Sequence, residues 1–337
     1  MSKERAGLIL PLLKEPSNLA RELRERVTQA VFETMGDSIL LSGGLDTSIV
    51  ATVAKSILQN NRDFKAFTVI LKEAPSPDLL FSKMISSYLK IPQHIESADI
   101  LTIETELPEV ISVLRSFDPM EIRNSVVSYI GMKKAKSEGC SKVMTGDGSD
   151  ELFGGYNFVF KQPEDKAREI LSHLWEVMHF SSIPLARSLG IEARLPFLHP
   201  AVAEFAKHEI DFQQLVGKHG DEVFGKYILR TAFEDLLPCE ITWRTKTPIE
   251  YGSGTTTLPK LYSRRIKDRE FEEKRRDYFR KDGVRLRDKE QLKYYEIFRN
   301  VLGPPITEDL NQRACPACTS NVPYKATFCT TCGEYPI

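Results

Sequence analysis

Short apolar segments alternate with helical segments over the first 145 residues, and this alternation restricts the possible folds more than any other feature. Strands are predicted at 38–42, 65–71, 93–95 and 141–145, with helices at 17–34, 47–58, 79–89, 102–116 and 123–138. Strands joined by helical crossovers pair in parallel, and the helices then cover both faces of the sheet. The sequence therefore predicts an α/β fold whose ligand site lies at the carboxyl ends of the strands.

The chain divides into three predicted parts: an α/β part (1–160), a helical part (161–305) and a small C-terminal module (306–337). No apolar run reaches the roughly 18 residues that a membrane helix needs, and the N-terminus lacks a secretory signal, so we expect a cytoplasmic protein. With 46 basic and 47 acidic residues the net charge is −1, which gives no reason to expect nucleic acid as a partner.

The first chemical motif is Ser-Gly-Gly-Leu-Asp-Thr-Ser, directly after the first strand. Its chemistry rests on two glycines, three hydroxyl residues and one acid: Ser42, Gly43, Gly44, Asp46, Thr47 and Ser48. Glycines let backbone amides approach an anion, and the hydroxyls add donors. Asp46 would repel that anion unless a divalent cation lay between them, so the motif predicts pyrophosphate with Mg²⁺. A ligand-free strand–helix turn is the alternative.

The second motif is Thr-Gly-Asp-Gly-Ser-Asp-Glu-Leu-Phe-Gly-Gly-Tyr, residues 145–156, after the last predicted strand. It holds three acids, Asp147, Asp150 and Glu151, which repel one another and need cations or raised pKa values. Asp150 is predicted to be a second Mg²⁺ ligand that faces Asp46. The alternative, a capped helix start, does not explain the four glycines.

Four of the six cysteines lie in the last 23 residues, as two Cys-x-x-Cys pairs: Cys315, Cys318, Cys329 and Cys332. This spacing predicts a tetrahedral Cys₄ zinc ribbon with a structural Zn²⁺, because no ligand position is left open. The ribbon's role stays open between a docking surface for a partner chain, an RNA contact and a brace on the catalytic part. We expect metal removal to unfold this tail without destroying the core.

Both glycine-rich motifs resemble those of the asparagine synthetase family, whose synthetase domain has the ATP pyrophosphatase (PP-loop, adenine nucleotide alpha-hydrolase) fold. Further stretches match in order over residues 17–255: Ser76-Pro-Asp78, Glu192-Ala-Arg-Leu-Pro-Phe-Leu198, Lys226-Tyr-Ile-Leu-Arg230, Leu237-Pro238 and Arg244-Thr-Lys246. With the zinc ribbon, the chain resembles a stand-alone, archaeal-like form of this family.

The resemblance implies an ATP-dependent amide ligase that adenylates a carboxylate, releases pyrophosphate, and lets ammonia or an amine displace AMP. Adenine would lie against the backbone at Leu40 and Val69, and the ribose against Thr145 and Gly146. Pyrophosphate would lie on the first motif, with Mg²⁺ on Asp46 and Asp150. Lys246 would neutralise charge on the α-phosphate, and Asp147 would assist the attacking amine. Aspartate is the expected carboxylate.

Three positions depart from the family pattern. Asp147 stands where these synthetases usually have Glu, and His199 where they usually have Asp; His199 is predicted to be structural. Ser2 stands where the family's glutaminase cysteine would be, so we expect no glutaminase in this chain. Nitrogen would then come from free ammonia, a separate glutaminase (a candidate partner for the ribbon) or another amine.

A tRNA-modifying sulfur transferase is the alternative function, because those enzymes share the pyrophosphate loop. They usually need cysteines at the site, and neither Cys140 nor Cys239 is well placed in the sequence. The acidic second motif favours the ligase.

Overall fold

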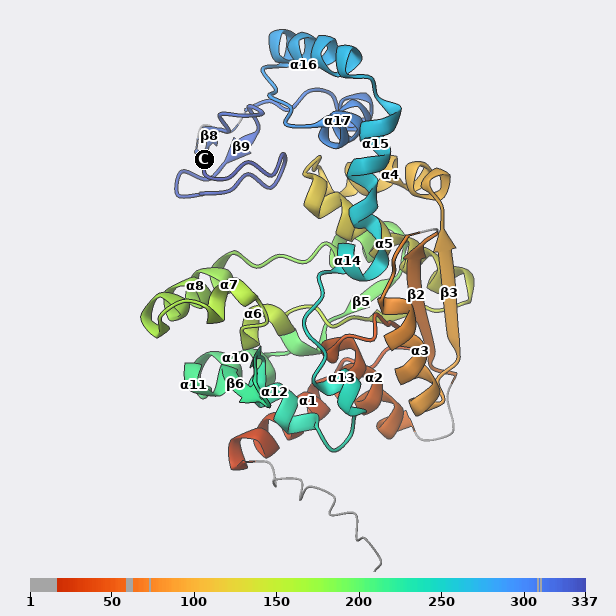
Figure 1. Ribbon diagram of the computed structural model, residues 1–337, viewed down its shortest axis with the longest axis vertical. Helices are drawn as coiled ribbons and strands as arrows, with labels where there is room; N and C mark the ends of the chain where they lie inside the picture. The colour runs from red at the N-terminus through yellow and green to blue at the C-terminus, as the bar shows by residue number, and fades with distance from the viewer. Residues whose placement is uncertain (1–16, 59–62, 73, 308, 310) are drawn as a thin grey trace, which may run out of the picture.

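The computed structural model describes residues 17–58, 63–72, 74–307, 309 and 311–337. Its centre is a parallel sheet in the order β3-β2-β1-β4-β5 (Figure 1). The strands are β1 (Ser38–Leu40), β2 (Lys65–Leu71), β3 (Gln93–Ala98), β4 (Lys142–Met144) and β5 (Glu192–Arg194). The predicted α/β fold with a parallel sheet is confirmed. Because the chain runs outward from β1 to β3 and then returns to β4, the two glycine-rich turns follow neighbouring strands.

Helices cover both faces of the sheet. The first five are α1 (Asn18–Glu33), α2 (Leu45–Leu58), α3 (Asp78–Leu89), α4 (Ile100–Leu114) and α5 (Pro119–Ser137). All five were predicted, with boundaries that differ by at most four residues. Ser17 caps α1 as expected, since its Oγ accepts the N–H of Ala20 at 3.2 Å.

Two hydrophobic cores lie on opposite sides of the sheet. Ala66 of β2 belongs to the core that α1 and α2 build, whereas Phe67 and Val69 belong to the core built by α4 and α5. Side chains alternate along a strand, so one strand serves both cores.

After β4 the chain is mainly helical, as expected. The helices are α6 (Ser149–Phe153), α7 (Asn157–Phe160), α8 (Glu164–Val177), α9 (Ser182–Ser188), α10 (Pro200–His208), α11 (Phe212–Leu215), α12 (Tyr227–Phe233), α13 (Cys239–Thr242), α14 (Ile249–Ser253), α15 (Leu258–Arg265), α16 (Asp268–Asp282) and α17 (Lys289–Leu302). Two 3₁₀ turns, 196–198 and 255–257, complete the set.

Strand β5 and the hairpin of β6 (Val216–His219) and β7 (Glu222–Gly225) were not predicted from the sequence. The β5 residues, Glu-Ala-Arg, have no apolar pattern, because β5 is an edge strand and pairs with β4 alone. Its place in the sheet is therefore decided by the tertiary structure.

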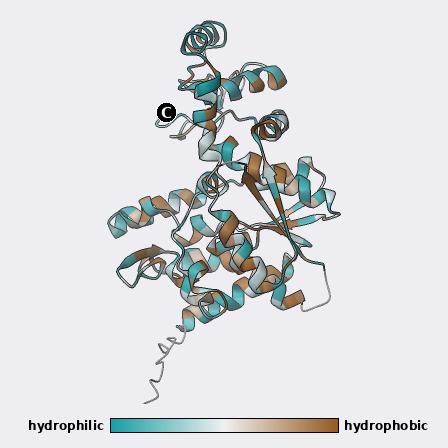
Figure 2. Cartoon of the chain, turned by 45° about the vertical axis from the view of Figure 1, so that its right-hand side comes forward, coloured by the Kyte–Doolittle hydropathy of each residue, from teal (hydrophilic) through white to brown (hydrophobic). Residues whose placement is uncertain are grey.

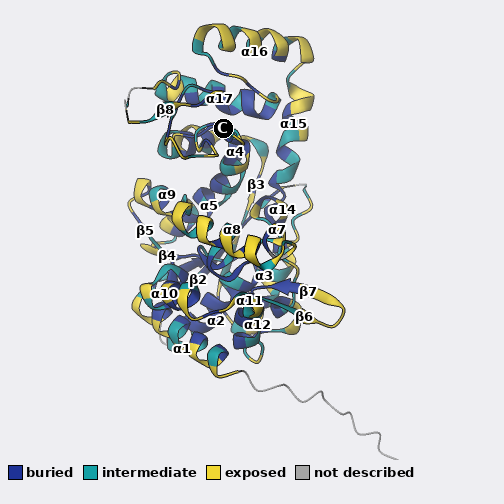
Figure 3. Cartoon of the chain, turned by 90° about the vertical axis from the view of Figure 1, so that its left-hand side faces the viewer, coloured by how far each residue is buried: buried dark blue, intermediate teal, exposed yellow. Residues whose placement is uncertain are grey.

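Most residues of 268–282 are charged, and they form α16, a solvated helix far from the sheet in Figure 1. It is mostly teal in Figure 2 and mostly exposed in Figure 3, with Phe271 as its buried residue. Within the described residues, no helix has the length and apolar character that a bilayer crossing requires.

The C-terminal module contains the short strands β8 (Arg313–Ala314) and β9 (Asn321–Val322). It packs against the rest of the protein, as one of the roles left open by the sequence, a brace, would require. Its cysteines belong to the same hydrophobic core as Phe117 and Tyr295.

Candidate active site

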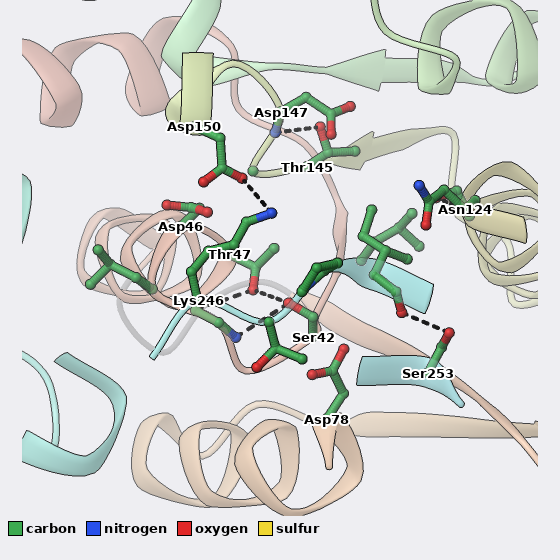
Figure 4. A pocket seen from close by; sticks show the side chains of 18 of the residues that line it. Ser42, Asp46, Thr47, Asp78, Asn124, Thr145, Asp147, Asp150, Lys246 and Ser253 are labelled. Atoms are coloured by element: carbon green, nitrogen blue, oxygen red, sulfur yellow. Dashed lines mark hydrogen bonds and ion pairs between the residues drawn. The ribbon is translucent and has the colours of Figure 1, made fainter. Parts of the chain in front are cut away.

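A cavity of about 550 Å³ opens at the carboxyl ends of β1, β2 and β4 (Figure 4). Most of the residues predicted for the site line it: Leu40, Ser42, Gly44, Asp46, Thr47, Val69, Thr145, Gly146, Asp147, Asp150 and Lys246. Two predicted residues, Gly43 and Ser48, are not part of this lining.

Gly43 lies against α3 behind the first turn, and Ser48 is buried in α2. Gly43 has φ +71°, and a Cβ on it would lie 2.3 Å from the backbone of Phe81 and Ser82. Glycine is thus needed for packing against α3 as well as for its backbone conformation. The hydroxyl of Ser48 is buried and has no hydrogen-bond partner.

Side chains within the first turn also fix its shape. The Oγ of Ser42 accepts the N–H of Gly44 at 3.2 Å and lies 3.2 Å from the Oγ1 of Thr47. The two glycine-rich turns touch, because a Cβ on Gly146 would lie 2.8 Å from the Cβ of Asp46. This contact brings the acids of both motifs to one place.

Lys226 lies between the two predicted metal ligands. Its Nζ is 2.6 Å from Oδ2 of Asp46 and 2.7 Å from Oδ1 of Asp150, and its side chain is 3% exposed. Burial opposes the charge on Lys226, but Asp150 and Asp46 outweigh it and raise the pKa of the amine. Burial likewise opposes ionisation of Asp150, but Lys226 and Lys246 outweigh it and lower the pKa of that carboxyl. Lys226 and Asp150 are therefore both charged at neutral pH.

Lys226 lies in a stretch that resembles the family, but its sequence context does not assign it to the site. One sequence signal did indicate a buried charge partner for Lys226. This lysine precedes the largely apolar helix α12, and an unpaired charge beside a buried helix would be costly. The sequence did not reveal the partners, which lie far away in the chain.

Lys246 is a second lysine near Asp150 and also lines the cavity. Its Nζ is 3.7 Å from Oδ2 of Asp150 and 4.9 Å above the ring of Tyr156. Its side chain is 25% exposed, so its amine is less confined than that of Lys226 and is open to a ligand in the cavity.

The pKa values of Asp147 and Glu151 shift in the opposite direction from that of Asp150. Burial raises the pKa of the Asp147 carboxyl, although Ser182 donates a hydrogen bond to it. Burial also raises the pKa of Glu151, whose Oε1 accepts the hydroxyl of Tyr156 at 2.6 Å. Neighbouring acids whose pKa values are pushed apart are suited to different roles, one to hold charge and another to exchange protons.

A buried ion pair holds the segment that carries Lys246. Nη2 of Arg244 is 2.7 Å from Oδ1 of Asp78, and the guanidinium lies 4.0 Å above the ring of Phe81. Its Nη1 also donates to the carbonyl of Ser42 at 3.4 Å. These contacts explain the use of Ser-Pro-Asp and Arg-Thr-Lys in this chain: they tie the 244–246 segment to the first turn.

His199 has the structural role that the sequence predicted. Its Nδ1 accepts the N–H of Ala201 at 3.3 Å at the start of α10, and its Nε2 lies 2.8 Å from Oε2 of Glu33. Ser2, the third position at which the chain departs from the family, lies outside the described residues.

The four C-terminal cysteines form one buried cluster. Their sulfurs lie within 4.8 Å of one another, with Cys315–Cys332 and Cys318–Cys329 both at 3.8 Å. Thiolates at the corners of a zinc tetrahedron with 2.3 Å bonds are roughly 3.8 Å apart. The N–H of Ala317 points at the sulfur of Cys315 at 3.4 Å. The donor set and its spacing fit Zn²⁺.

A cavity at the turning point of a parallel sheet, with two glycine turns, acids and lysines, is typical of a phosphate-binding α/β protein. A family model described as asparagine synthase matches residues 18–189 and 184–305. The chain belongs to the asparagine synthase family.

Curated relatives agree with this assignment. The chain is 28% identical to asparagine synthetase B [glutamine-hydrolyzing] of Escherichia coli, over 86% of this chain and 54% of that protein. It is 30% identical to a probable asparagine synthetase of Dictyostelium discoideum, over 86% and 57%. The chain thus spans about half the length of these relatives.

Among solved structures, the chain is similar to an NMN synthetase from Francisella tularensis, with a TM-score of 0.38 and 11% identity over 87% of this chain and 98% of that one. It is also similar to an NH3-dependent NAD synthetase from Campylobacter jejuni, with a TM-score of 0.35 and 14% identity over 87% and 97%.

Proposed function

We propose that this protein is an ATP-dependent amide ligase that forms AMP and pyrophosphate, with aspartate as its carboxylate and ammonia or another amine as its nitrogen donor. The observation that carries the proposal is the meeting of Asp46, Asp150 and Lys226 where the two glycine-rich turns touch. Membership of the asparagine synthase family supports the ligase class.

ATP is proposed to lie along the cavity from α5 to the first turn. Adenine would contact Leu40 and Val69, where α5 comes so close that a Cβ on Gly131 would lie 2.8 Å from Cδ2 of Leu40. The ribose would lie at Thr145 and Gly146. The oxygens of pyrophosphate would accept hydrogen bonds from backbone amides and hydroxyls of residues 42–48.

The acids at the turns fit a magnesium ion. Asp46 and Asp150 together offer about eight lone-pair sites, whereas the ammonium of Lys226 has three protons to give. The other oxygen of Asp150, Oδ2, lies 3.7 Å from Nζ of Lys246, beyond hydrogen-bond distance. When bound, Mg²⁺ would stabilise the negative charge of the departing pyrophosphate.

The proposed reaction has two steps. A carboxylate oxygen of the substrate attacks the α-phosphorus, and the bond from that phosphorus to the bridging oxygen of pyrophosphate breaks. The amine then attacks the acyl carbon, AMP leaves with the oxygen that joined it to the acyl group, and the amine loses a proton. Lys246 is the proposed charge partner of the α-phosphate, and Asp147 the proposed acceptor of the proton.

An oxygen-isotope experiment tests this function. With [¹⁸O]carboxylate-labelled aspartate, Mg-ATP and ammonium, we expect pyrophosphate release and one ¹⁸O in AMP, because AMP keeps the bridging oxygen. Label in inorganic phosphate instead would mean attack at the γ-phosphorus. No pyrophosphate release with any of a panel of carboxylates would contradict the ligase.

The sulfur transferase, the alternative from the sequence, gains no support from the cysteine positions. Neither Cys140 nor Cys239 lines the cavity. Cys140 is buried at the start of β4, at the opposite end of that strand from the turns.

Asp147→Asn is expected to separate stability from activity. Because burial raises the pKa of Asp147 above its usual 3.8, ionising this carboxyl costs folding free energy, and the cost grows as the pH rises above that value. The variant should therefore gain stability relative to the parent between about pH 4 and 7, and lose amide formation at least about tenfold. Thermal unfolding across this pH range and product assays measure both effects. A variant less stable than the parent at pH 7 would contradict the electrostatic assignment.

We also propose that the Cys₄ cluster binds one structural Zn²⁺ per chain. Elemental analysis of the purified protein tests this, and replacement of Cys318 and Cys329 by Ser should abolish the bound zinc.

A further inference from the structure

Residues 311–337 of the C-terminal module are here called the ribbon, and each of its two Cys-x-x-Cys turns is called a knuckle. The second knuckle is hydrogen-bonded to the connection between α4 and α5. The N–H of Phe117 donates to the carbonyl of Thr331 at 2.7 Å, and the Oγ of Ser116 donates to the carbonyl of Thr330 at 2.7 Å. Thr330 and Thr331 are the two residues between Cys329 and Cys332. The residues that shape the predicted metal site therefore also accept bonds from the residues just before α5.

The segment that enters α17 holds the ribbon from a second side. Arg287 donates to the carbonyls of Gly333 at 2.8 Å and Cys332 at 3.0 Å, and Nε2 of Gln291 donates to Cys332 at 2.8 Å. The N–H of Arg285 donates to the carbonyl of Ala317, in the other knuckle, at 2.7 Å. Both knuckles are thus fixed to the rest of the protein by backbone carbonyls.

Close packing accompanies these bonds. A Cβ on Gly333, which has φ +75°, would lie 2.1 Å from Oδ1 of Asp118. Phe117 is fully buried, and its ring packs on Tyr295 and Phe298 at centroid distances of 5.0 and 5.1 Å. The ribbon therefore packs directly against Asp118 at the start of α5.

Helix α5 connects this contact to the candidate active site. Asp118 caps α5 by accepting the N–H of Met120 at 3.3 Å. Four residues along the next turns line the cavity: Met120, Asn124, Val127 and Ser128. The residues at the start of α5 and those that line the cavity therefore belong to one continuous helix, drawn near the centre of Figure 1.

We propose that the ribbon is a brace for α5, so that metal binding at its four cysteines positions the wall of the candidate nucleotide cavity. The ribbon is too small to fold on its own apolar surface, so metal binding would supply much of the free energy that keeps it ordered. Without metal, the carbonyls of Thr330, Thr331 and Cys332 lose their fixed positions, and the start of α5 loses the bonds that hold it. The link to nucleotide rests on the proposed function, whereas the brace itself does not.

Hydrogen exchange of the full chain, with zinc bound and after chelation, tests the brace without any activity. We expect amides of residues 117–128 to exchange about tenfold faster in the zinc-free protein. Amides of α2 and of residues 130–137 should not change. In parallel, the affinity for Mg-ATP measured by calorimetry should fall by about tenfold, the equivalent of one or two lost hydrogen bonds.

A double variant separates the brace from the metal site. Arg287→Ala with Gln291→Ala removes side-chain bonds to the carbonyls of Cys332 and Gly333. It keeps all four cysteines and the Oγ of Ser116, which accepts the N–H of Asp118 at the start of α5. We expect one zinc per chain, faster exchange at 117–128 and weaker ATP binding. The matched control is Arg313→Ala, which loses a 2.8 Å bond from this arginine to the carbonyl of Ala326 inside the ribbon and should leave α5 unchanged.

The outcomes are distinct. Unchanged exchange at 117–128, in both the zinc-free chain and the double variant, would overturn the brace. Equal acceleration in α2 would overturn it too, because the metal would then hold the whole fold. Faster exchange with unaltered ATP affinity would overturn the link to the cavity. If the zinc-bound parent does not bind ATP while α5 responds to chelation, the proposed function fails and the brace stands.

Discussion

Lys226→Met is expected to remove activity and to lower the free energy of unfolding by about 3–5 kcal/mol at neutral pH, because it leaves Asp46 and Asp150 facing each other without their shared cation. Chemical denaturation measures the loss. Lys83→Met, which replaces an exposed lysine on α3, is the control and should change stability little.

Magnesium gives this prediction a second readout. If the two carboxylates can hold a cation, millimolar Mg²⁺ should restore part of the stability of Lys226→Met, because a ligand that binds the folded state stabilises it. The double variant Lys226→Met/Asp150→Asn keeps one of the two carboxylates and should gain much less. An identical gain in both variants, or none in either, would contradict the magnesium assignment.

Asp150→Asn is expected to lower the rate of pyrophosphate release on the order of 10²-fold or more and to leave the protein folded. The fold should survive because Lys226 keeps both oxygens of Asp46, at 2.6 and 2.7 Å. The rate should fall because one of two carboxylates that would hold the metal opposite the leaving pyrophosphate is lost.

Pyrophosphate assays at saturating and limiting Mg²⁺ measure this effect, and we expect Asp46→Asn to behave alike. Asp221→Asn, in the exposed turn of the β6–β7 hairpin, is the matched control. A rate close to that of the parent in Asp150→Asn would remove this residue from the proposed catalytic machinery.

The pH dependence of stability should reflect the interaction of Asp150 with its lysine partners, Lys226 and Lys246. Because its lysine partners lower the pKa of Asp150 below the usual 3.8, this carboxylate stabilises the fold above that value. The contribution is lost as the pH falls through the lowered pKa. In Asp150→Asn, this acid-limb loss should be smaller than in the parent.

Local chemistry allowed the sequence to predict the strands before residue 145, the turns after 42 and 145, and the cysteine cluster. Apolar runs of strand length, glycines where the backbone turns sharply, and paired Cys-x-x-Cys spacings act over a few residues each. The same locality explains the less accurate predictions. Gly43 looks like a ligand-facing glycine in the sequence, but its missing Cβ makes room for α3, a contact between distant segments.

Two features were decided by the tertiary structure alone. Lys226 is separated by 180 residues from Asp46, and only the packing of α12 beside the turns brings the amine between two acids. The ribbon follows the last family motif in the sequence and therefore looked separable, yet Phe117 and Arg287 fix it to the start of α5. Motif spacing determines which groups exist and what they prefer to bind. The distances between these groups depend on how helices pack and on hydrogen bonds to backbone carbonyls. Every residue has a backbone carbonyl, so no sequence pattern predicts these contacts.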